Sequence, residues 1–252
     1  MTFEHYFDKH FELRYSEMNN LGVATPTVML ALLEETAADH CYSINHSLFD
    51  LVEKNIGWVL VSCILQMNRY PNYKEKITIR TWLSSYSSVK GYRENIIFDE
   101  KENRIGSARG LWVFFDIQKR KPIPIFKDIK EKWHFYHKES ILTDIKKKIE
   151  PIHSAQHVKH FRVNRFDIDM NEHVNNIRYL QWVIESVPKE IVENYHLHQI
   201  NGRFIAEEQY GDTIVSLTNK DMNPDSFLHT IKIEGSNKVC ATAKTIWREN
   251  KI

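Results

Sequence analysis

An internal repeat constrains this chain more than any other feature of its sequence. Three short segments of the first half recur, in the same order, in the second half. The matching pairs are Arg14–Asn19 with Arg165–Asn171, Tyr73–Ile77 with Tyr210–Ile214, and Ala108–Trp112 with Ala243–Trp247. Their separations are 152 (at the Met-Asn pair), 137 and 135 residues. The order indicates two copies of one unit, and the length of 252 residues suits two small domains.

Each copy is predicted to begin with one long helix. In the first copy Thr25 fits the N-cap, and Pro26 fits the first helical position. In the second copy the helix begins near Asn175, and apolar residues recur every three or four positions as far as Val187. A shorter helix follows in each copy. The two shorter segments are Ser47–Lys54 and Lys189–Asn194.

Strands follow the helices in both copies. In the first they are expected at Trp58–Tyr70, Lys76–Ser84, Tyr92–Phe98 and Ile105–Phe115, and in the second at Gln199–Glu208, Thr213–Asn219, Ser226–Glu234 and Val239–Trp247. Consecutive strands without intervening helices form antiparallel sheets. The predicted fold class is therefore α+β, with one long helix against an antiparallel sheet in each copy.

The domains are expected at residues 1–117 and 152–252, joined by a linker at residues 118–151. The linker contains two basic runs, Lys119–Lys121 and Lys146–Lys148. It can be a solvated connector or a docking strip for an acidic partner. We favour the connector, because Glu131, Glu139 and Asp144 dilute the positive charge.

Composition excludes several classes of protein. The chain has 34 Lys and Arg against 33 Asp and Glu, and a dedicated nucleic-acid binder needs a larger basic surplus. We expect no membrane span and no secretory signal, because no apolar run is long enough. Three widely spaced cysteines favour reduced thiols and a cytoplasmic location.

No cofactor or metal site is expected. The sequence lacks G-x-G-x-x-G, the phosphate loop G-x-x-x-x-G-K-[ST] and the nucleophile elbow G-x-S-x-G. Local groups of histidines have no cysteine or H-E-x-x-H partner, so we interpret them as surface residues rather than zinc ligands. These groups are His134 with His137; His153, His157 and His160; and His196 with His198.

One motif contains most of the candidate catalytic residues. Residues 166–179 read FDIDMNEHVNNIRY, which contains D-x-D-x-N-x-H-V-N-N-x-x-Y. This motif resembles that of acyl-ACP thioesterases, the plant and bacterial enzymes that end fatty-acid synthesis. The duplication and the linker resemble the same family. The resemblance implies a tandem (double) hotdog fold, with two antiparallel sheets each wrapping a long helix. It also implies hydrolysis of fatty acyl-ACP, with acyl carrier protein bearing a phosphopantetheine-linked acyl chain as partner.

Apart from the resemblance, the residue types and position of the motif suit thioester hydrolysis. It directly precedes a helix, and the unpaired backbone amides at a helix N-terminus carry partial positive charge. Amides near Val174, Asn175 and Asn176 can therefore hold a developing oxyanion. Asp169, Asn171 and His173 alternate along an extended segment, so their side chains can share one face and orient a water.

A strand-borne carboxylate is expected to complete the site. The resemblance implies an acid on the first central strand after the helices, and Phe204–Asp212 resembles that strand, with Glu207 at the matching position. Its role is general base or water orienter. In plant members a Cys follows this Glu, whereas this chain has Glu208. The alternation of side chains along a strand does not decide which of the two glutamates faces the site, and we favour Glu207 over Glu208.

The repeat predicts a single active site, in the second copy. A separation of 152 pairs His173 with Leu21 and Asp169 with Glu17, and a separation of 137 pairs Glu207 with Tyr70. The first copy therefore lacks the His and the strand acid. The resemblance implies that it binds the acyl chain, and the candidate pocket residues are Met29, Leu33 and Cys63.

Several alternatives stay open at this point. The same site can serve acyl-CoA, and a hotdog frame can be a non-catalytic acyl binder. A hotdog dehydratase is disfavoured, because H-V-N-N does not match the setting of its catalytic His. Either a water or Asp169 can be the nucleophile. The sequence gives neither the chain-length preference nor the oligomeric state, and a homodimer is one option.

Overall fold

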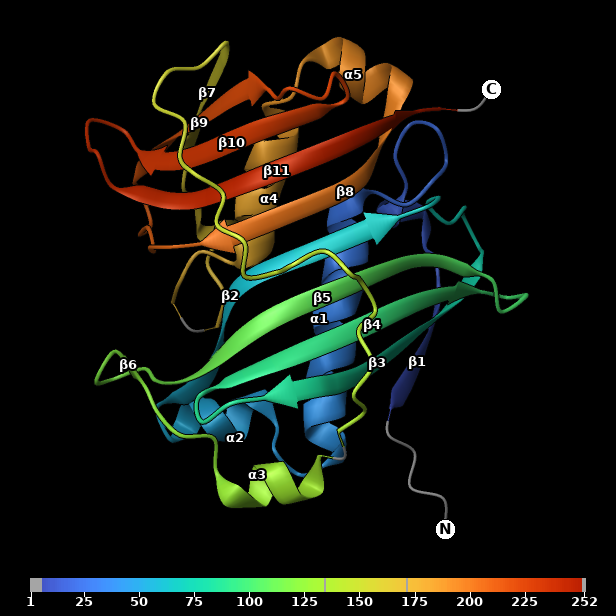
Figure 1. Cartoon of the computed structure of the whole chain (residues 1–252), viewed down its shortest axis with the longest axis vertical. Helices are drawn as coiled ribbons and strands as arrows, with labels where there is room; N and C mark the ends of the chain where they lie inside the picture. The colour runs from blue at the N-terminus through green and yellow to red at the C-terminus, as the bar shows by residue number, and fades with distance from the viewer. Residues whose placement is uncertain (1–5, 134, 171, 251–252) are drawn as a thin grey trace. The chain divides into compact units, whose positions relative to one another are not determined.

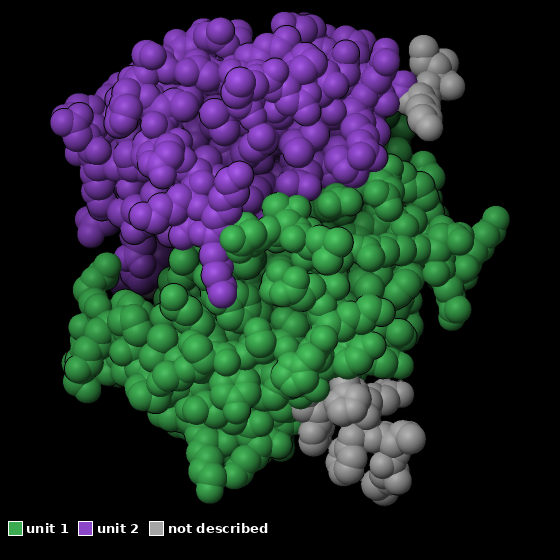
Figure 2. All heavy atoms as spheres, viewed as in Figure 1, with its two compact units in different colours: residues 1–61, 65–145 green, residues 62–64, 146–252 purple. Residues whose placement is uncertain are grey.

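The structure is a computed structural model that describes residues 6–133, 135–170 and 172–250. The chain divides into two compact units, coloured separately in Figure 2: Met1–Val61 with Leu65–Ile145, and Ser62–Ile64 with Lys146–Ile252. Each unit combines one long helix with an antiparallel sheet (Figure 1). The prediction of an α+β fold with a helix and an antiparallel sheet in each copy is confirmed.

The first unit has a five-stranded sheet in the order β1-β3-β4-β5-β2, with the small strand β6 paired to β5. Its elements are β1 (Phe7–Glu12), the 3-10 helix η1 (Tyr15–Glu17), α1 (Pro26–Ser43), α2 (Leu48–Glu53), β2 (Ile56–Met67), β3 (Lys76–Tyr86), β4 (Lys90–Asp99), β5 (Arg104–Asp116), β6 (Lys121–Pro122) and α3 (Lys127–Lys132). The pairs β1–β3, β3–β4 and β4–β5 are antiparallel.

The second unit repeats this plan, with its strands in the order β8-β11-β10-β9-β7. Its elements are β7 (His157–Arg162), η2 (Arg165–Asp167), α4 (Asn176–Glu185), α5 (Lys189–Asn194), β8 (Tyr195–Phe204), β9 (Thr213–Lys220), β10 (Ser226–Ile233) and β11 (Val239–Glu249). All four strand pairs are antiparallel.

Both long helices begin as the sequence predicts. The Thr25 hydroxyl accepts a hydrogen bond from the Val28 amide at 3.3 Å, and Pro26 is the first helical residue. The Asn175 side chain accepts from the Ile177 amide at 2.7 Å, and α4 starts at the next residue. Side-chain caps satisfy amides that a helix start leaves unpaired. The cap therefore fixes where α4 begins, within the motif and three residues after His173.

Gly202 lets α4 approach β8 closely. A Cβ atom at Gly202 would lie 2.7 Å from Cδ2 of Leu180 on the helix, closer than real carbon atoms pack. Leu180 and Val183 on the same helix are buried. The absent side chain therefore leaves room for the Leu180 side chain of α4 against β8.

The sequence missed β1 and β7. In the described chain these are the outermost strands of the two sheet orders, and both are mostly half-buried or exposed. Edge strands of this kind carry charged and polar residues, which weakens the alternating apolar pattern. Apolar periodicity therefore does not reveal them.

The predicted strand Gln199–Glu208 was also wrong in its bounds, since β8 spans Tyr195–Phe204. The strand ends there because the amides of Ile205 and Ala206 both donate to the carbonyl of Cys240, at 2.8 and 3.2 Å. Residues 205–209 are therefore an irregular segment after the strand.

The segment between the two copies matches the solvated connector that we favoured only in part. Ile129 of α3 and the following Trp133 are buried, packed in one cluster with Cys41 and Phe114. Much of the rest of the segment is exposed, including both basic runs, at residues 119–121 and 146–148. Part of this segment is thus core of the first unit.

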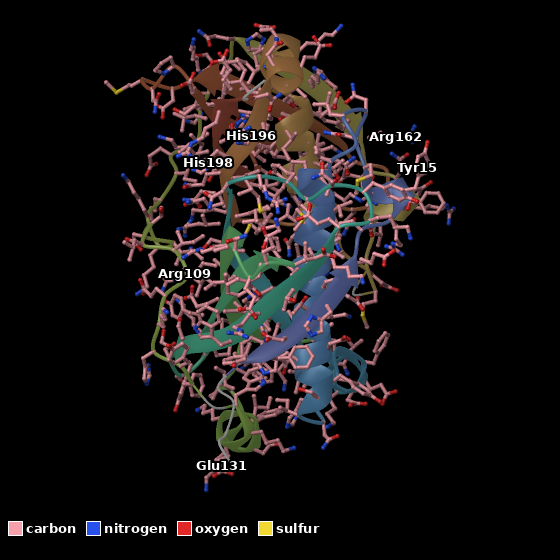
Figure 3. All side chains as sticks on the ribbon, turned by 90° about the vertical axis from the view of Figure 1, so that its right-hand side faces the viewer. Tyr15, Arg109, Glu131, Arg162, His196 and His198 are labelled. Carbon is pink, nitrogen blue, oxygen red and sulfur yellow. The ribbon has the colours of Figure 1, made fainter. Side chains whose placement is uncertain are left out.

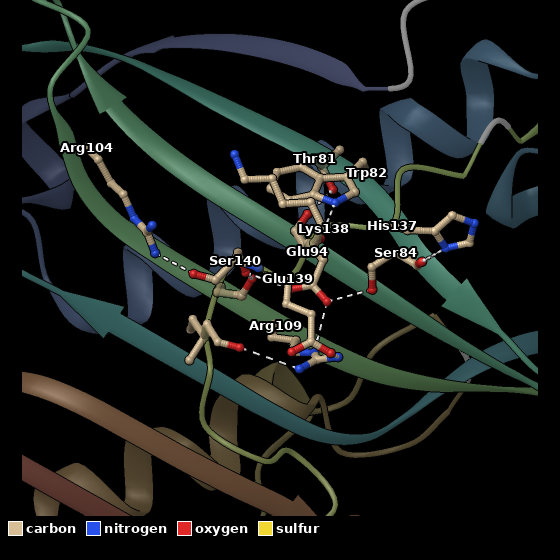
Figure 4. A network of polar contacts seen from close by, with 12 residues as sticks. Thr81, Trp82, Ser84, Glu94, Arg104, Arg109, His137, Lys138, Glu139 and Ser140 are labelled. Carbon is tan, nitrogen blue, oxygen red and sulfur yellow. Dashed lines mark hydrogen bonds and ion pairs between the residues drawn. The ribbon is translucent and has the colours of Figure 1, made fainter.

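A buried polar network fastens the same segment to the sheet (Figure 4). Glu94 on β4 is fully buried and forms an ion pair with Arg109 on β5 at 2.9 Å. Its carboxylate also accepts from the Ser84 hydroxyl at 2.7 Å, and from the amide and hydroxyl of Ser140 at 2.9 and 2.7 Å. One carboxylate therefore connects three strands, β3, β4 and β5, to the segment after α3.

Among the helices in residues 6–133, 135–170 and 172–250, none has both the length and the apolar character that crossing a membrane requires.

Candidate active site

The motif forms a tight loop between η2 and α4. Ile168 and Val174 form an isolated antiparallel bridge, and the Asp169 amide donates to the His173 carbonyl at 2.8 Å. The His173 amide in turn lies 3.4 Å from Oδ1 of Asp169. Glu172 closes the loop with a φ of 61°, a left-handed conformation that costs a residue with a side chain some energy. This loop holds Asp169 and His173 next to each other.

Hydrogen bonds connect the loop to the start of α4. The Asn175 amide donates to the Asp167 carbonyl at 2.8 Å, while its side chain caps the helix. Val174 is buried, and Asn175 and Asn176 are half-buried. The first turn of α4 is thus positioned at the loop, and its amides carry the partial positive charge of a helix N-terminus.

Glu207 lies beside His173. Its Oε2 is 3.5 Å from Nε2 of the imidazole, and the two side chains are 38% and 32% exposed. The irregular segment that follows β8 carries this glutamate, and Lys238 donates to its backbone carbonyl at 2.7 Å. The pair therefore combines a defined geometry with access for a water molecule.

Glu208, in contrast to Glu207, is buried. It is only 1% exposed, and one of its oxygens accepts a hydrogen bond from the Tyr179 hydroxyl. Burial raises the pKa of Glu208 above its ordinary value. The structure thus places Glu207, and not Glu208, within reach of His173.

The remaining predicted residues lie as follows. Asn171 lies outside the described residues. Met29 is fully buried and Leu33 is 8% exposed, both on α1 of the first unit. The sequence assigned no role to Tyr179, Lys238 or Cys240, although Tyr179 is the last residue of the motif. Nothing in a single sequence signals that Lys238 would reach the Glu207 carbonyl.

The first unit repeats three backbone hydrogen bonds of the motif loop with a uniform shift of 150 residues: Asn19 to Val23, Gly22 to Asn19 and Thr25 to Glu17 correspond to Asp169 to His173, Glu172 to Asp169 and Asn175 to Asp167. Met18 bridges Ala24 as Ile168 bridges Val174, and α1 and α4 begin at Pro26 and Asn176. The predicted shift of 152 was wrong for this segment, because the similar letters Met-Asn do not occupy equivalent positions. Structurally, His173 corresponds to Val23 and Asp169 to Asn19. The inference that the first copy lacks the His is unchanged.

The two units differ in one backbone bond of this loop. In the first unit the Ala24 amide donates to the Pro71 carbonyl at 2.8 Å. The turns before β3 and β9 are related by a shift of 137, so Pro71 corresponds to Glu208 and Tyr70 to Glu207. In the second unit, no acceptor among the described residues takes a hydrogen bond from the Val174 amide, the counterpart of Ala24. The amide of Val174 thus lacks the backbone partner that the amide of Ala24 has in the first unit.

The histidine groups are only partly the surface residues we expected. His153, His157 and His160 are exposed. His196 and His198 lie on β8 (Figure 3), and His198 is buried, so the prediction was wrong for that residue. In the described ranges, no cluster of three or more His, Cys, Asp or Glu is arranged to hold a metal ion. Cys41, Cys63 and Cys240 are free thiols.

Comparison with protein families gives two matches in chain order. Residues 4–133 match the acyl-ACP thioesterase N-terminal domain, and residues 150–249 match the acyl-ACP thioesterase C-terminal domain.

Curated relatives match over nearly the whole chain. The chain is similar to the chloroplastic oleoyl-acyl carrier protein thioesterase of Coriandrum sativum, with 27% identity over 94% of this chain and 68% of the relative. It is 24% identical to oleoyl-acyl carrier protein thioesterase 1 of Arabidopsis thaliana, over 96% of this chain and 76% of that protein.

Solved structures share the fold. An acyl-ACP thioesterase from Bacteroides thetaiotaomicron superposes with a TM-score of 0.86 at 23% identity, covering 97% of this chain and 98% of its own. The 12:0-ACP thioesterase from Umbellularia californica gives the same TM-score at 20% identity, covering 98% of both chains.

Proposed function

The chain belongs to the acyl-ACP thioesterase family, and from that premise we propose that it hydrolyses fatty acyl-ACP to free fatty acid and holo-ACP. The observation that carries this proposal is the 3.5 Å approach of Glu207 to His173 beside the start of α4. A non-catalytic acyl binder needs neither an acid next to an imidazole nor an unpaired amide beside them.

The thioester carbonyl is bound at the first turn of α4. Its oxygen accepts from the Val174 amide, and the amides of Asn175 and Asn176 add the positive potential of the helix start. Asn171, whose role rests on the motif alone, helps to hold the substrate. Charge that develops on the oxygen during attack is thereby stabilised.

Glu207 and His173 activate the attacking water. The water oxygen bonds to the carbonyl carbon as its proton passes to the carboxylate of Glu207, with His173 as the neighbouring proton carrier. When the tetrahedral intermediate collapses, the carbon–sulfur bond breaks. The same pair then returns the proton to the departing thiolate of the phosphopantetheine arm. Asp169 orients His173 through the motif loop.

Asp169 is the alternative nucleophile. Its carboxylate would attack the carbonyl carbon and form an anhydride, which water would then cleave. A single turnover in oxygen-18 water separates the two routes. Label in the Asp169 side chain supports the anhydride, and label in the fatty acid alone supports direct attack by water.

We assign the two halves different tasks. Residues 152–252 form the catalytic repeat, residues 1–117 bind the acyl chain, and residues 118–151 join them. Met29 and Leu33 on α1 are the proposed contacts with the chain, because both are buried and apolar. Substitution of either residue by Phe should shift the preferred acyl length without abolishing turnover.

The deciding experiment is a panel of acyl-ACPs of varied chain length, with released thiol as the readout. The corresponding acyl-CoAs are assayed in parallel. A higher kcat/KM for the ACP substrates, reduced by salt, supports the carrier protein as the partner. A preference for CoA identifies an acyl-CoA thioesterase with the same site, and no turnover of either class contradicts the proposal.

The proposed location is the cytoplasm, since three buried thiols suit a reducing compartment. Sedimentation of the purified chain will decide between a monomer and a homodimer.

A further inference from the structure

Two adjacent acids, Glu207 and Glu208, end up in unlike surroundings, and only Glu207 has a role in the proposed reaction. Glu208 is buried in the second unit, beside Tyr179. Its carboxyl group is 1% exposed and accepts from the Tyr179 hydroxyl. No nitrogen or oxygen donor among the described residues reaches its second oxygen, Oε1. The Cys240 thiol is its other hydrogen-bonding neighbour. Burial of a carboxylate with so few donors is unfavourable, which favours the neutral form.

The groups that face Glu208 agree with a neutral carboxyl. Tyr179 and Cys240 are both buried, and burial raises the pKa of each, so both face Glu208 as uncharged hydrogen-bonding groups. The charge of Lys238 acts on Glu208 in the opposite direction, and the ammonium group of Lys238 donates to the Glu207 carbonyl. The net effect of burial still raises the pKa of Glu208.

Tyr179 is a rigid anchor for this hydrogen bond. It lies in the first turn of α4 and is 3% exposed. Its ring packs edge-to-face on Trp182 and Phe204, with centroids 5.6 and 5.7 Å apart. The hydroxyl is therefore fixed relative to both the helix and the end of β8.

In the first unit a different hydrogen bond holds the corresponding segment in place. There the segment after β2 is fastened to the motif loop by the backbone bond from Ala24 to Pro71. The counterparts of Tyr179 and Glu208 are Met29 and Pro71, which cannot form a side-chain hydrogen bond. In the second unit the backbone bond is missing among the described residues, and the side-chain bond is present.

We propose that Glu208 is a neutral positioning residue, whose hydrogen bond to Tyr179 replaces that backbone bond. The replacement holds residues 205–208 against α4, which keeps Glu207 beside His173. It also leaves the Val174 amide free for the thioester carbonyl. This inference rests on the proposed function for its catalytic consequence.

Kinetics of three variants test the proposal. Glu208→Gln keeps a neutral hydrogen-bonding group, so we expect kcat within about threefold of wild type and an unchanged pH–rate profile. Glu208→Ala and Tyr179→Phe should each lower kcat roughly 10- to 100-fold with little change in KM, because a displaced catalytic group slows the chemical step. The double variant should be no slower than either single one, since both remove the same bond.

Two outcomes would overturn the proposal. One is a Glu208→Gln variant as inactive as Glu207→Gln, or with a shifted pH profile, which would make Glu208 an acid–base group. The other is full activity of Glu208→Ala. Crystal structures of the wild type and of Glu208→Ala add a readout that needs no turnover. The distance between Glu207 and His173 should lengthen in the variant, and an unchanged distance contradicts positioning even if the wild type hydrolyses no thioester.

Discussion

Nε2 of His173 lies 3.5 Å from Oε2 of Glu207, although one residue precedes α4 and the other follows β8. Both side chains are about one-third exposed, so water reaches them. A second His–Glu pair in the same unit, His160 with Glu234, has a 2.8 Å separation and lies away from the motif on β7 and after β10. That second pair provides matched controls for the first.

Glu207→Gln should lower kcat by roughly 10²- to 10⁴-fold, because the amide cannot take a proton from water. Thiol release from acyl-ACP measures the rate, and circular dichroism checks that the variant is folded. Glu234→Gln is the control and should retain wild-type kcat. Equal rates for Glu207→Gln and wild type would show that the acid is not the base.

His173→Asn should also lower kcat by about 10²-fold or more, because Asn cannot carry a proton. Groups that act as one unit show strongly non-additive losses. The double variant His173→Asn with Glu207→Gln should therefore be about as slow as the slower single variant. Multiplicative losses would indicate that the two residues act independently, and His160→Asn should have no effect.

Asn175→Ala removes the cap of α4 and should lower both stability and kcat. The loss of a cap costs about 1 kcal/mol in unfolding free energy, and a frayed first turn no longer holds the oxyanion. Thr25→Ala, which removes the equivalent cap of α1, should cost similar stability with kcat unchanged. Urea unfolding measures the first quantity and thiol release the second. An equal loss of kcat in both variants would contradict a role for the α4 start.

Acid should destabilise the fold through His229. This residue is fully buried, and its two ring nitrogens lie 2.9 Å from the hydroxyls of Thr218 and Thr245. Burial lowers the pKa of His229 to about 3, from 6.5. The folded pKa is the lower one, so its contribution is complete above pH 6.5 and is lost as pH falls toward 3.

The expected slope is about 1.4 kcal/mol per pH unit in that window. His229→Gln should show a shallower decline of unfolding free energy between about pH 6 and pH 4 in urea titrations. Its matched control is His160→Gln, at an exposed histidine, which should keep the wild-type slope. Parallel curves for wild type and His229→Gln would show that the buried imidazole titrates normally.

Glu94→Gln should destabilise the first unit by about 3–5 kcal/mol, because Arg109 would lose its buried counter-charge and keep only the half-exposed Glu139. Glu139→Gln removes the other carboxylate that Arg109 contacts, at 2.6 Å, but that side chain is 50% exposed. Its loss should cost less than about 1 kcal/mol. The shift in urea midpoint measures both, and similar costs for the two variants would argue against a dominant role for the buried pair.

The sequence by itself determined the duplication, the two long helices and the chemistry-bearing motif. These features depend on local signals, namely caps such as Thr25 and Asn175, helical periodicity, and a run of residue types that suits one reaction. Local signals also explain two errors of the sequence analysis. The outermost strands β1 and β7 were not predicted, because they lack apolar alternation. Similar residues at non-equivalent positions gave an offset of 152 between the two copies, whereas the hydrogen-bonded loops are offset by 150.

The tertiary structure alone decided which of two adjacent glutamates meets the imidazole. Strand alternation could not choose between Glu207 and Glu208, because the strand ends at Phe204 and the acids lie on an irregular segment. Contacts with distant residues orient that segment: the Cys240 carbonyl, the Lys238 ammonium group and the Tyr179 hydroxyl. Such contacts form only when β8, β11 and α4 pack together, so their outcome is a property of the folded unit and not of the local sequence.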